Sequence, residues 1–321
     1  MARLRMGRWV VAGLMVGLIN PAAAQSYPER NITCLVAFAA GGIADVIARL
    51  VAQGLGERIH HTVVVENRGG AGGSLAAKVV STAAADGYTI LATTTALAVS
   101  ESAVRNKGFS IDDLRPIAIV ALSPDVIAVH PSNPAKDLRE FINSGKDRSF
   151  TYGSAGVGTG PHIGAEYFFR EIAKVKAVHV PFTGGAPAVQ SAIGNHVDAV
   201  VLTLPTVVPA ISQGLLRGIG LASASRNPAV AEVPTYGEMG FPEVYSGSWV
   251  GFFAPAGVPD PVVAILNDAI NRIIREPQAQ QKIKAIGFEP LFMGPTETAG
   301  YFRREVASWT RMTRAIGFAT D

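Results

Sequence analysis

Four closely spaced glycines are the first residues of this 321-residue chain whose type and spacing suit a chemical task. Gly153, Gly156, Gly158 and Gly160 lie in the segment Thr151–Phe169, between a strand-like and a helix-like stretch. The first backbone N–H groups of a helix have no partner within it and lie at the positive end of its dipole. Glycine lets a ligand approach such groups closely. On these residues alone, a bound anion and a tight turn without a ligand fit the loop equally well.

The spacing of these glycines disfavours a nucleotide. A dinucleotide-binding loop follows G-x-G-x-x-G, which would need glycine where the chain has Pro161. A Walker-type phosphate loop would need a lysine after the glycines, and none follows. Pro161 suits the first position of a helix, where its missing N–H has no cost. Ser154 and Thr159 add hydroxyl groups, so a small anion fits the loop better than a nucleotide.

A second loop of the same kind strengthens the anion-binding interpretation. Residues Phe38–Asp45, "FAAGGIAD", also connect a strand-like stretch to a helix-like one. If the two loops lie on different lobes, both helix N-termini can face one cleft. Asp45 suits the positive first turn of its own helix, which is capping support rather than ligand binding. Asp45 and Arg49 form an i,i+4 pair, which we expect to be solvated and of little energetic weight.

Hydroxyl-bearing residues follow three further strand-like stretches. Thr93–Thr95 ends the third strand of the N-terminal part, and Thr183–Gly185 and Thr203 occupy the corresponding place in the second half of the chain. Ligands of open α/β sheets bind outside the carboxyl ends of the strands. Ligand contact and ordinary turn capping explain these residues about equally well.

The sequence shows no catalytic or metal-binding set. His162 and Glu166 are spaced i,i+4, but no third residue has the spacing of a zinc ligand. The G-x-S-x-G and S-x-x-K motifs of acylating enzymes do not occur, and no pair of carboxylates suits acid–base catalysis. We therefore expect no catalytic residue, no metal and no cofactor. Trp249 fits either a ligand cleft or the core.

The elements that must hold these loops follow a repeated order of strand, glycine-rich turn and helix. Strand-like stretches lie at 32–38, 62–67 and 88–93, and the first is the nearly continuous apolar run of a strand covered on both faces. Apolar residues with helical spacing follow at 44–55, and an amphipathic helix is expected at 261–275. This alternation predicts an α/β fold with a parallel sheet.

The N-terminal residues 1–24 are typical of a secretory signal peptide. Arg3, Arg5 and Arg8 precede an apolar run that is shorter than the roughly 20 residues of a membrane-spanning helix, and a small-residue cleavage site follows. These three arginines account for the whole net charge of +3, so the expected mature chain has balanced charges. No basic stripe suits nucleic acid or an anionic membrane. We expect a soluble chain exported to the periplasm.

The chain resembles the Bug-type periplasmic solute-binding proteins of tripartite tricarboxylate transporters. The resemblance covers nearly the whole expected mature chain and rests on ordered blocks: "VAFAAGGIADVIARLVAQGL", "VVVENRGGAGGSLAAKVVSTAAADGYTIL", "VHPSNPAKDLREFI", "TYGSAGVGTGPHIGAEYF", "HVPFTGGAPAVQSAIGNHVDAV", "VPTYGEMGFP", "WVGFFAPAGVPDPVVAILNDAI" and "GFEPL". It implies a type II periplasmic-binding-protein fold, in which two α/β lobes close on a ligand in the cleft between them. The first lobe would comprise residues 25–123 and 222–321, and the second residues 124–221.

The ligands of this family are typically small carboxylates, held largely by loop backbone groups and ordered waters. Transferred block by block, the implied contacts are Ala40, Gly41, Gly42, Ser154, Ala155, Gly156, Gly158, Thr159, His162, Thr183 and Gly184, followed by Thr93, Thr94, Thr203 and Trp249. The chain departs from the family's pattern at Ala39–Ala40, where proline is common, and at Ile43 and Thr203, where polar or acidic side chains are common. With fewer charged side chains, we expect a plain mono- or dicarboxylate rather than an amino acid.

The function that the resemblance implies is capture of a carboxylate in the periplasm and its delivery to the membrane permease of the transporter. A monomer that binds no nucleic acid is expected. A receptor that presents its ligand to a sensor kinase would have the same sequence features. An enzyme on the same fold would need a catalytic set, which the residues do not show, so we expect that the chain is not an enzyme.

Overall fold

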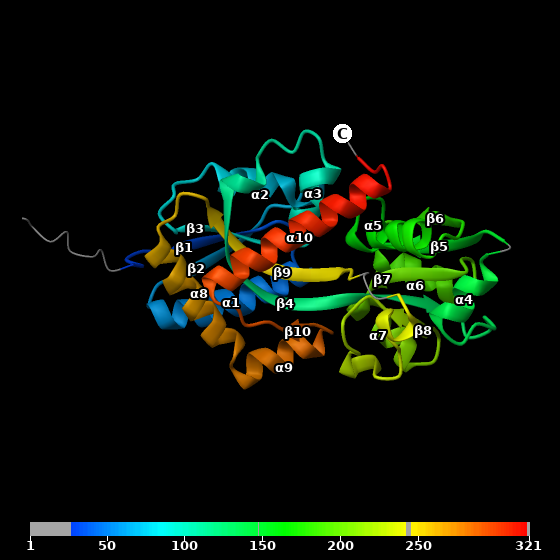
Figure 1. Ribbon diagram of the computed structural model, residues 1–321. Helices are drawn as coiled ribbons and strands as arrows, with labels where there is room; N and C mark the ends of the chain where they lie inside the picture. The colour runs from blue at the N-terminus through cyan, green and yellow to red at the C-terminus, as the bar shows by residue number, and fades with distance from the viewer. Residues whose placement is uncertain (1–26, 147, 242–244, 320–321) are drawn as a thin grey trace, which may run out of the picture.

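The computed structural model describes residues 27–146, 148–241 and 245–319. The expected signal peptide lies outside these ranges. Within them, no helix is both long enough and apolar enough to cross a membrane. Figure 1 shows two lobes side by side, with strand β4 (Leu114–Val129) running from one into the other and β9 (Gly247–Pro255) beside it.

Each lobe is built on its own part of the sheet. In the first lobe the strand order is β2–β1–β3–β9–β4, and β10 also pairs with β4. In the second lobe the order is β4–β7–β5–β6, and β8 also pairs with β4. The remaining strands are β1 Ile32–Val36, β2 Val63–Asn67, β3 Thr89–Thr94, β5 Phe150–Ser154, β6 Ala177–Pro181, β7 Ala199–Thr203, β8 Arg217–Leu221 and β10 Glu289–Pro290.

Helices cover both faces of the sheet in each lobe. The first lobe packs α1, α8 and α9 on one face and α2, α3 and α10 on the other, and the second packs α4 and α5 opposite α6 and α7. Burial on both faces explains why the central strands are apolar almost throughout. The helices are α1 Ile43–Ile59, α2 Ser74–Ser81, α3 Ala96–Ala103, α4 Leu138–Ser144, α5 Gly160–Tyr167, α6 Gly185–Ile193, α7 Leu204–Ser212, α8 Asp260–Ile274, α9 Pro277–Ala285 and α10 Pro295–Ala315.

The structure confirms most of the predicted elements and corrects the expected direction of some strands. The strands expected at 32–38, 62–67 and 88–93 are present, with ends that differ by a few residues. The predicted parallel pairing is confirmed for β1, β2 and β3 and for β5, β6 and β7. It is wrong for the crossing strands, because β9 runs antiparallel to both β3 and β4, and β4 runs antiparallel to β7. Apolar patterning marks a buried strand but not its direction, which the path of the connecting chain decides. Helix α3, directly after Thr93–Thr95, was not predicted.

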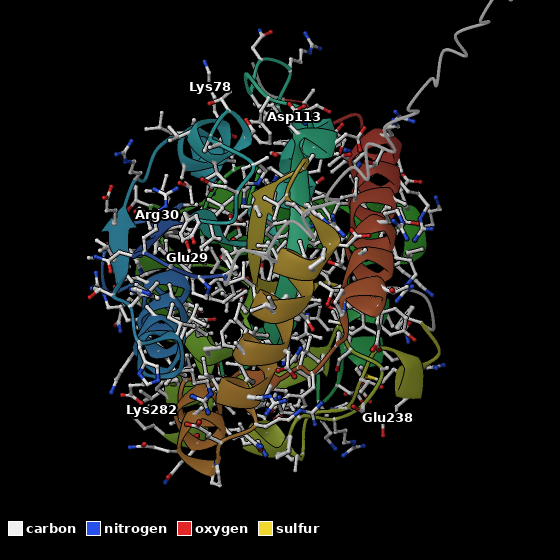
Figure 2. The ribbon with its side chains drawn as sticks, turned by 90° about the vertical axis from the view of Figure 1, so that its left-hand side faces the viewer. Glu29, Arg30, Lys78, Asp113, Glu238 and Lys282 are labelled. Atoms are coloured by element: carbon white, nitrogen blue, oxygen red, sulfur yellow. The ribbon has the colours of Figure 1, made fainter. Side chains whose placement is uncertain are left out.

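Charged side chains of both signs lie on the outside of the molecule. Figure 2 shows Lys78 and Asp113 at one end of the view and Glu238 and Lys282 at the other. The pair between Arg226 and Glu238, with its atoms 2.9 Å apart, leaves both side chains about half exposed. Exposed pairs of this kind contribute little to stability. The fold is therefore held chiefly by the apolar layers on the two faces of the sheet.

Two crossing segments join the lobes. The first is β4, which pairs with β9 as far as Pro124 and with β7 from Asp125 on. The second precedes β9. Val230 and Tyr236 still pack in the apolar layers of the second lobe, although the sequence analysis assigned them to the first. From this packing we propose that the second crossing lies near Ser246.

Candidate ligand-binding site

The directions of the strands bring the predicted loops to one junction. Strand β4 runs from the first lobe into the second, and β9 runs back antiparallel to it. Because β3 is antiparallel to β9 and β1 is parallel to β3, the carboxyl ends of β1 and β3 point toward the second lobe. Strand β7 is antiparallel to β4, and β5 is parallel to β7 and β6, so their carboxyl ends point toward the first lobe. The loops that follow these five strands therefore face each other across the junction.

The first-lobe loop owes its shape to a glycine and an acid. Gly41 has φ +82°, a conformation that favours glycine. Its N–H donates to Oδ2 of Asp45 over 2.8 Å. Gly42 is the N-cap residue of α1, and Ala40 beside it is exposed. The loop is thus closed onto the first turn of its own helix.

Asp45 holds this loop in place through its hydrogen bonds, whereas the sequence analysis expected only capping support and a weak ion pair. Its side chain is almost fully buried, and it accepts hydrogen bonds from Arg49 Nε at 3.1 Å and Asn67 Nδ2 at 2.9 Å. Burial alone would raise the pKa of Asp45, but the bonds from Arg49, Gly41 and Asn67 hold it below its usual range. The expectation of a solvated, weak pair is therefore wrong for the acid, although Arg49 itself is about half exposed.

The second-lobe loop is closed by its own hydroxyl groups. Ser154 Oγ lies 3.2 Å from the N–H nitrogen of Gly156 and 2.8 Å from Nε2 of His179. Thr159 Oγ1 donates to the carbonyl oxygen of Gly156 over 2.8 Å. Gly156 and Gly158 have φ values of +138° and +78°, so a side chain at either position would strain the backbone. The residues from 154 to 159 thus form a fixed turn.

His162 holds this turn through a hydrogen bond to its backbone. Its Nδ1 accepts the N–H of Gly158 over 3.1 Å, so that nitrogen carries no proton. Its ring lies against that of His179, tilted by 31° with centroids 4.0 Å apart, and lies edge-on to Phe318 at 5.3 Å. Burial and the neighbouring His179 lower the pKa of His162 to about 4, so the ring is neutral at pH 7. The role of His162 in this structure is to hold the loop.

Three predicted N–H donors already have partners in the structure. The N–H groups of Gly41, Gly156 and Gly158 bond to side chains of their own loops. Among the described residues, the N–H groups of Ala40, Ala155 and Val157 donate to no protein acceptor. Ala40 and Ala155 were predicted, whereas Val157 was missed because its apolar side chain conceals the role of its backbone. A ligand at the junction would meet these three donors and the first turns of α1 and α5.

The remaining predicted residues at strand ends fall into two groups. Thr183 is exposed after β6, and Gly184, at φ +145°, is the N-cap residue of α6. Both therefore stay within reach of a ligand at the junction. Thr94 Oγ1 accepts the N–H of Ala96 over 3.3 Å, and Thr93 is buried within β3. The two threonines thus act as ordinary turn and strand residues in this structure.

Two of the predicted contacts, Trp249 and Thr203, have partners within the protein in this structure. Trp249 is fully buried in the first lobe, and its Nε1–H donates to Oε2 of Glu305 over 2.9 Å. It is a core residue, because its large ring fills the layer between the sheet and α10. The hydroxyl of Thr203 donates to Oδ1 of Asp125 over 3.2 Å, so it is engaged within the protein.

Asp125 was missed by the sequence analysis and lies where the crossing segments meet. Its side chain is 1% exposed and accepts hydrogen bonds from Thr203 and, over 2.5 Å, from Ser246 Oγ. Its backbone N–H donates to the carbonyl oxygen of Ser246, and its carbonyl accepts from Ala222. Burial raises the pKa of Asp125 to about 6, despite the two hydroxyl donors. A buried carboxyl group thus ties the two crossing segments together.

The sequence model described as "Tripartite tricarboxylate transporter family receptor" matches residues 47–318 of the chain. The chain belongs to this family. The family named in the sequence analysis is thereby confirmed. The family consists of binding receptors, which agrees with the expectation that the chain is not an enzyme.

Three relatives span nearly the whole length of the chain. It is 31% identical over 307 residues to the protein BugT of Bordetella pertussis, covering 94% of each chain. Among solved structures, R. palustris Rpa4515 with adipate is 28% identical, with TM-score 0.78 over 92% of this chain and 100% of that one. MatC (Rpa3494) from Rhodopseudomonas palustris with bound malate is 29% identical, with TM-score 0.73 over 89% and 99%. The predicted two-lobe periplasmic-binding-protein fold is confirmed.

Proposed function

We propose that this receptor captures a small mono- or dicarboxylate between its two lobes in the periplasm and delivers it to the permease of a tripartite tricarboxylate transporter. The observation that carries the proposal is the convergence of five strand ends on one junction, with the backbone donors of Ala40 on one side and of Ala155 and Val157 on the other. Structural relatives with adipate and malate bound support a carboxylate as the ligand class.

The loops favour a carboxylate over an amino acid. Asp45 is the one acid within the loop segments 38–45 and 154–162. It is committed to Gly41, Arg49 and Asn67. An ammonium group at the junction would therefore have no uncommitted acid on either loop, and desolvating it would cost free energy. A ligand that carries only carboxylates and apolar carbon suits the N–H donors better.

Closure of the lobes would bring the two sets of donors onto one ligand. Hydrogen bonds from N–H groups to a carboxylate contribute about 1.5–3 kcal/mol each, so a few of them support micromolar binding. The hinge would lie where Asp125 and Ser246 join the two crossing segments. The permease would then recognise the closed form, which the ligand selects by binding it more tightly than the open form.

The ligand class is tested by calorimetry on the purified mature chain. We expect saturable binding of at least one of a series that includes adipate, malate, succinate and a C4 monocarboxylate. Aspartate and glutamate serve as the comparison. Tight binding of either amino acid together with no binding of the simple carboxylates would overturn the proposal.

The contribution of the loop backbone is tested at Val157, whose side chain is 59% exposed. Val157→Pro removes the N–H, and Val157→Ala shortens the side chain but keeps the N–H. We expect the proline variant to bind the carboxylate at least about tenfold more weakly, which corresponds to one charge-assisted hydrogen bond. The alanine variant should bind normally. Equal affinity of the two variants would argue against a backbone contact at this position.

A further inference from the structure

A cavity lies at the hinge, and its lining contains no residue of the loops 38–45 and 154–159. Its volume is about 310 Å³. One wall is a face of α10, and the others come from both crossing segments. The lining residues are Tyr301, Glu305 and Trp309 of α10, Leu122 and Pro124 of the first crossing, and Ala222, Ser223, Ala224, Tyr245, Ser246 and Gly247 of the second. None of the predicted carboxylate contacts is among them.

The wall formed by α10 places a carboxylate between two aromatic rings. Tyr301, Glu305 and Trp309 are spaced four residues apart, so they lie along one face of the helix. Oε2 of Glu305 accepts the indole N–H of Trp309 over 3.1 Å and that of Trp249 over 2.9 Å. Among the described residues, Oε1 of Glu305 receives no hydrogen bond. One carboxylate oxygen is thus fixed by the core, and the other remains available at the cavity.

The two indole N–H groups that bond to Glu305 do not require its negative charge. Two indole N–H groups need only acceptor oxygens, which an uncharged amide would also provide. Burial raises the pKa of Glu305, because the ionised form loses hydration, while the two indole N–H groups and the charge of Arg304 act in the opposite direction. A cation in the cavity would offset that loss. An anion would be repelled, and a purely apolar ligand would leave Oε1 without a partner.

The other side chains of the cavity suit an organic cation. The rings of Tyr301 and Trp309 line it on one side, and Tyr245, 59% exposed, lines it from the second crossing segment. Aromatic rings attract ammonium groups through their π faces, most strongly when the cation is partly desolvated. From this combination of rings, one accessible carboxylate oxygen and a cavity of about 310 Å³, we propose that the hinge cavity is a second ligand site, for a small alkylammonium or quaternary ammonium compound.

The site is tested with choline and its uncharged isostere 3,3-dimethylbutan-1-ol, measured by calorimetry or NMR on the mature chain. We expect saturable choline binding, with the alcohol at least tenfold weaker. Choline affinity should also rise with pH, because a proton and the cation compete for Glu305. No choline binding at millimolar concentration, or equal binding of the two probes, would overturn the proposal.

Variants assign the binding to the cavity. Glu305→Gln keeps an acceptor for the two indoles and removes the charge, so choline affinity should fall at least tenfold. Glu297→Gln makes the same change at an exposed position in the first turn of α10 and should leave it unaltered. Should Glu305→Gln fail to fold, Tyr245→Ala changes an exposed side chain and should weaken choline binding about fivefold. Unchanged binding in the Tyr245 variant, or in a folded Glu305 variant, contradicts the assignment.

Discussion

The hydroxyl of Ser246 donates a hydrogen bond to Oδ2 of Asp125 over 2.5 Å, and the two residues belong to the two different segments that cross between the lobes. Their backbones are also joined, because the N–H of Asp125 donates to the carbonyl oxygen of Ser246. Gly164 of α5 makes room for this contact, since a Cβ there would lie 2.3 Å from Ser246 Oγ. The hinge is therefore a packed joint around a buried acid.

Asp125→Asn should stabilise the protein at high pH relative to the parent. Because burial raises the pKa of Asp125 to about 6, the folded state favours the protonated acid. Its contribution is complete below pH 4 and is lost as the pH rises through 6, by at most about 3 kcal/mol. Denaturant unfolding at pH 4, 6 and 8 should show the difference growing in favour of the asparagine variant. Glu232→Gln, at an exposed position, is the control, and a difference that does not depend on pH would refute the assignment.

His162→Asn should remove a loss of stability on acidification. The pKa of His162 is lowered to about 4 in the folded state. Between pH 6.5 and 4, the imidazole is therefore protonated in the unfolded chain but stays neutral in the folded chain. The resulting loss between pH 6.5 and 4 is at most about 3 kcal/mol. Asparagine still offers an acceptor to Gly158.

The same histidine can be observed directly. NMR titration of the parent should show the His162 ring losing its proton near pH 4, and a midpoint near 6.5 would contradict the burial argument. The contributions of His162 and Asp125 have opposite signs over nearly the same pH range. The parent's stability should therefore vary less with pH than that of either variant.

Asp45→Asn should destabilise the first lobe by about 1–3 kcal/mol at pH 7, because the hydrogen bonds that Asp45 accepts from Gly41 and Arg49 lose their charge assistance. The pKa of Asp45 is lowered in the folded state, so its contribution is present above the unfolded-state pKa and fades as the pH falls. Urea unfolding at pH 7 and pH 3 measures both effects. Glu57→Gln, at an exposed position in the same helix, should change little. An equal effect of the two substitutions would mean that the buried hydrogen bonds of Asp45 contribute no more to stability than an exposed side chain does.

Phe318→Ala should increase the mobility of the second-lobe loop, although Phe318 lies far from this loop in the sequence. Phe318 follows α10 of the first lobe, yet its ring lies against His162 and the backbone of Gly158 in the second. Hydrogen–deuterium exchange at residues 155–160 should speed up several-fold, because the loop loses one of its supports. Leu215→Ala, at an exposed apolar residue of the second lobe, serves as the control. Unchanged exchange in the Phe318 variant would show that the contact does not restrain the loop.

The sequence by itself determined the local structure of this protein. Apolar runs marked the buried strands, such as 32–38, because a strand covered on both faces needs apolar side chains throughout. Glycines marked the turns, since Gly41 and Gly158 adopt conformations that other residues avoid. Pro161 marked the start of α5, where a residue without an N–H fits. Each of these rules acts within a few residues, and a sequence shows such short ranges directly.

Only the tertiary structure decided which groups at the junction are available to a ligand. The glycines of both loops were correctly placed, but Asp45, Ser154 and His162 take up the N–H groups of three of them. The joint between Asp125 and Ser246, and the bond between Trp249 and Glu305, connect residues far apart in the chain. Spacing in the sequence carries no record of such contacts, because they depend on the direction of β9 and the path of both crossing segments.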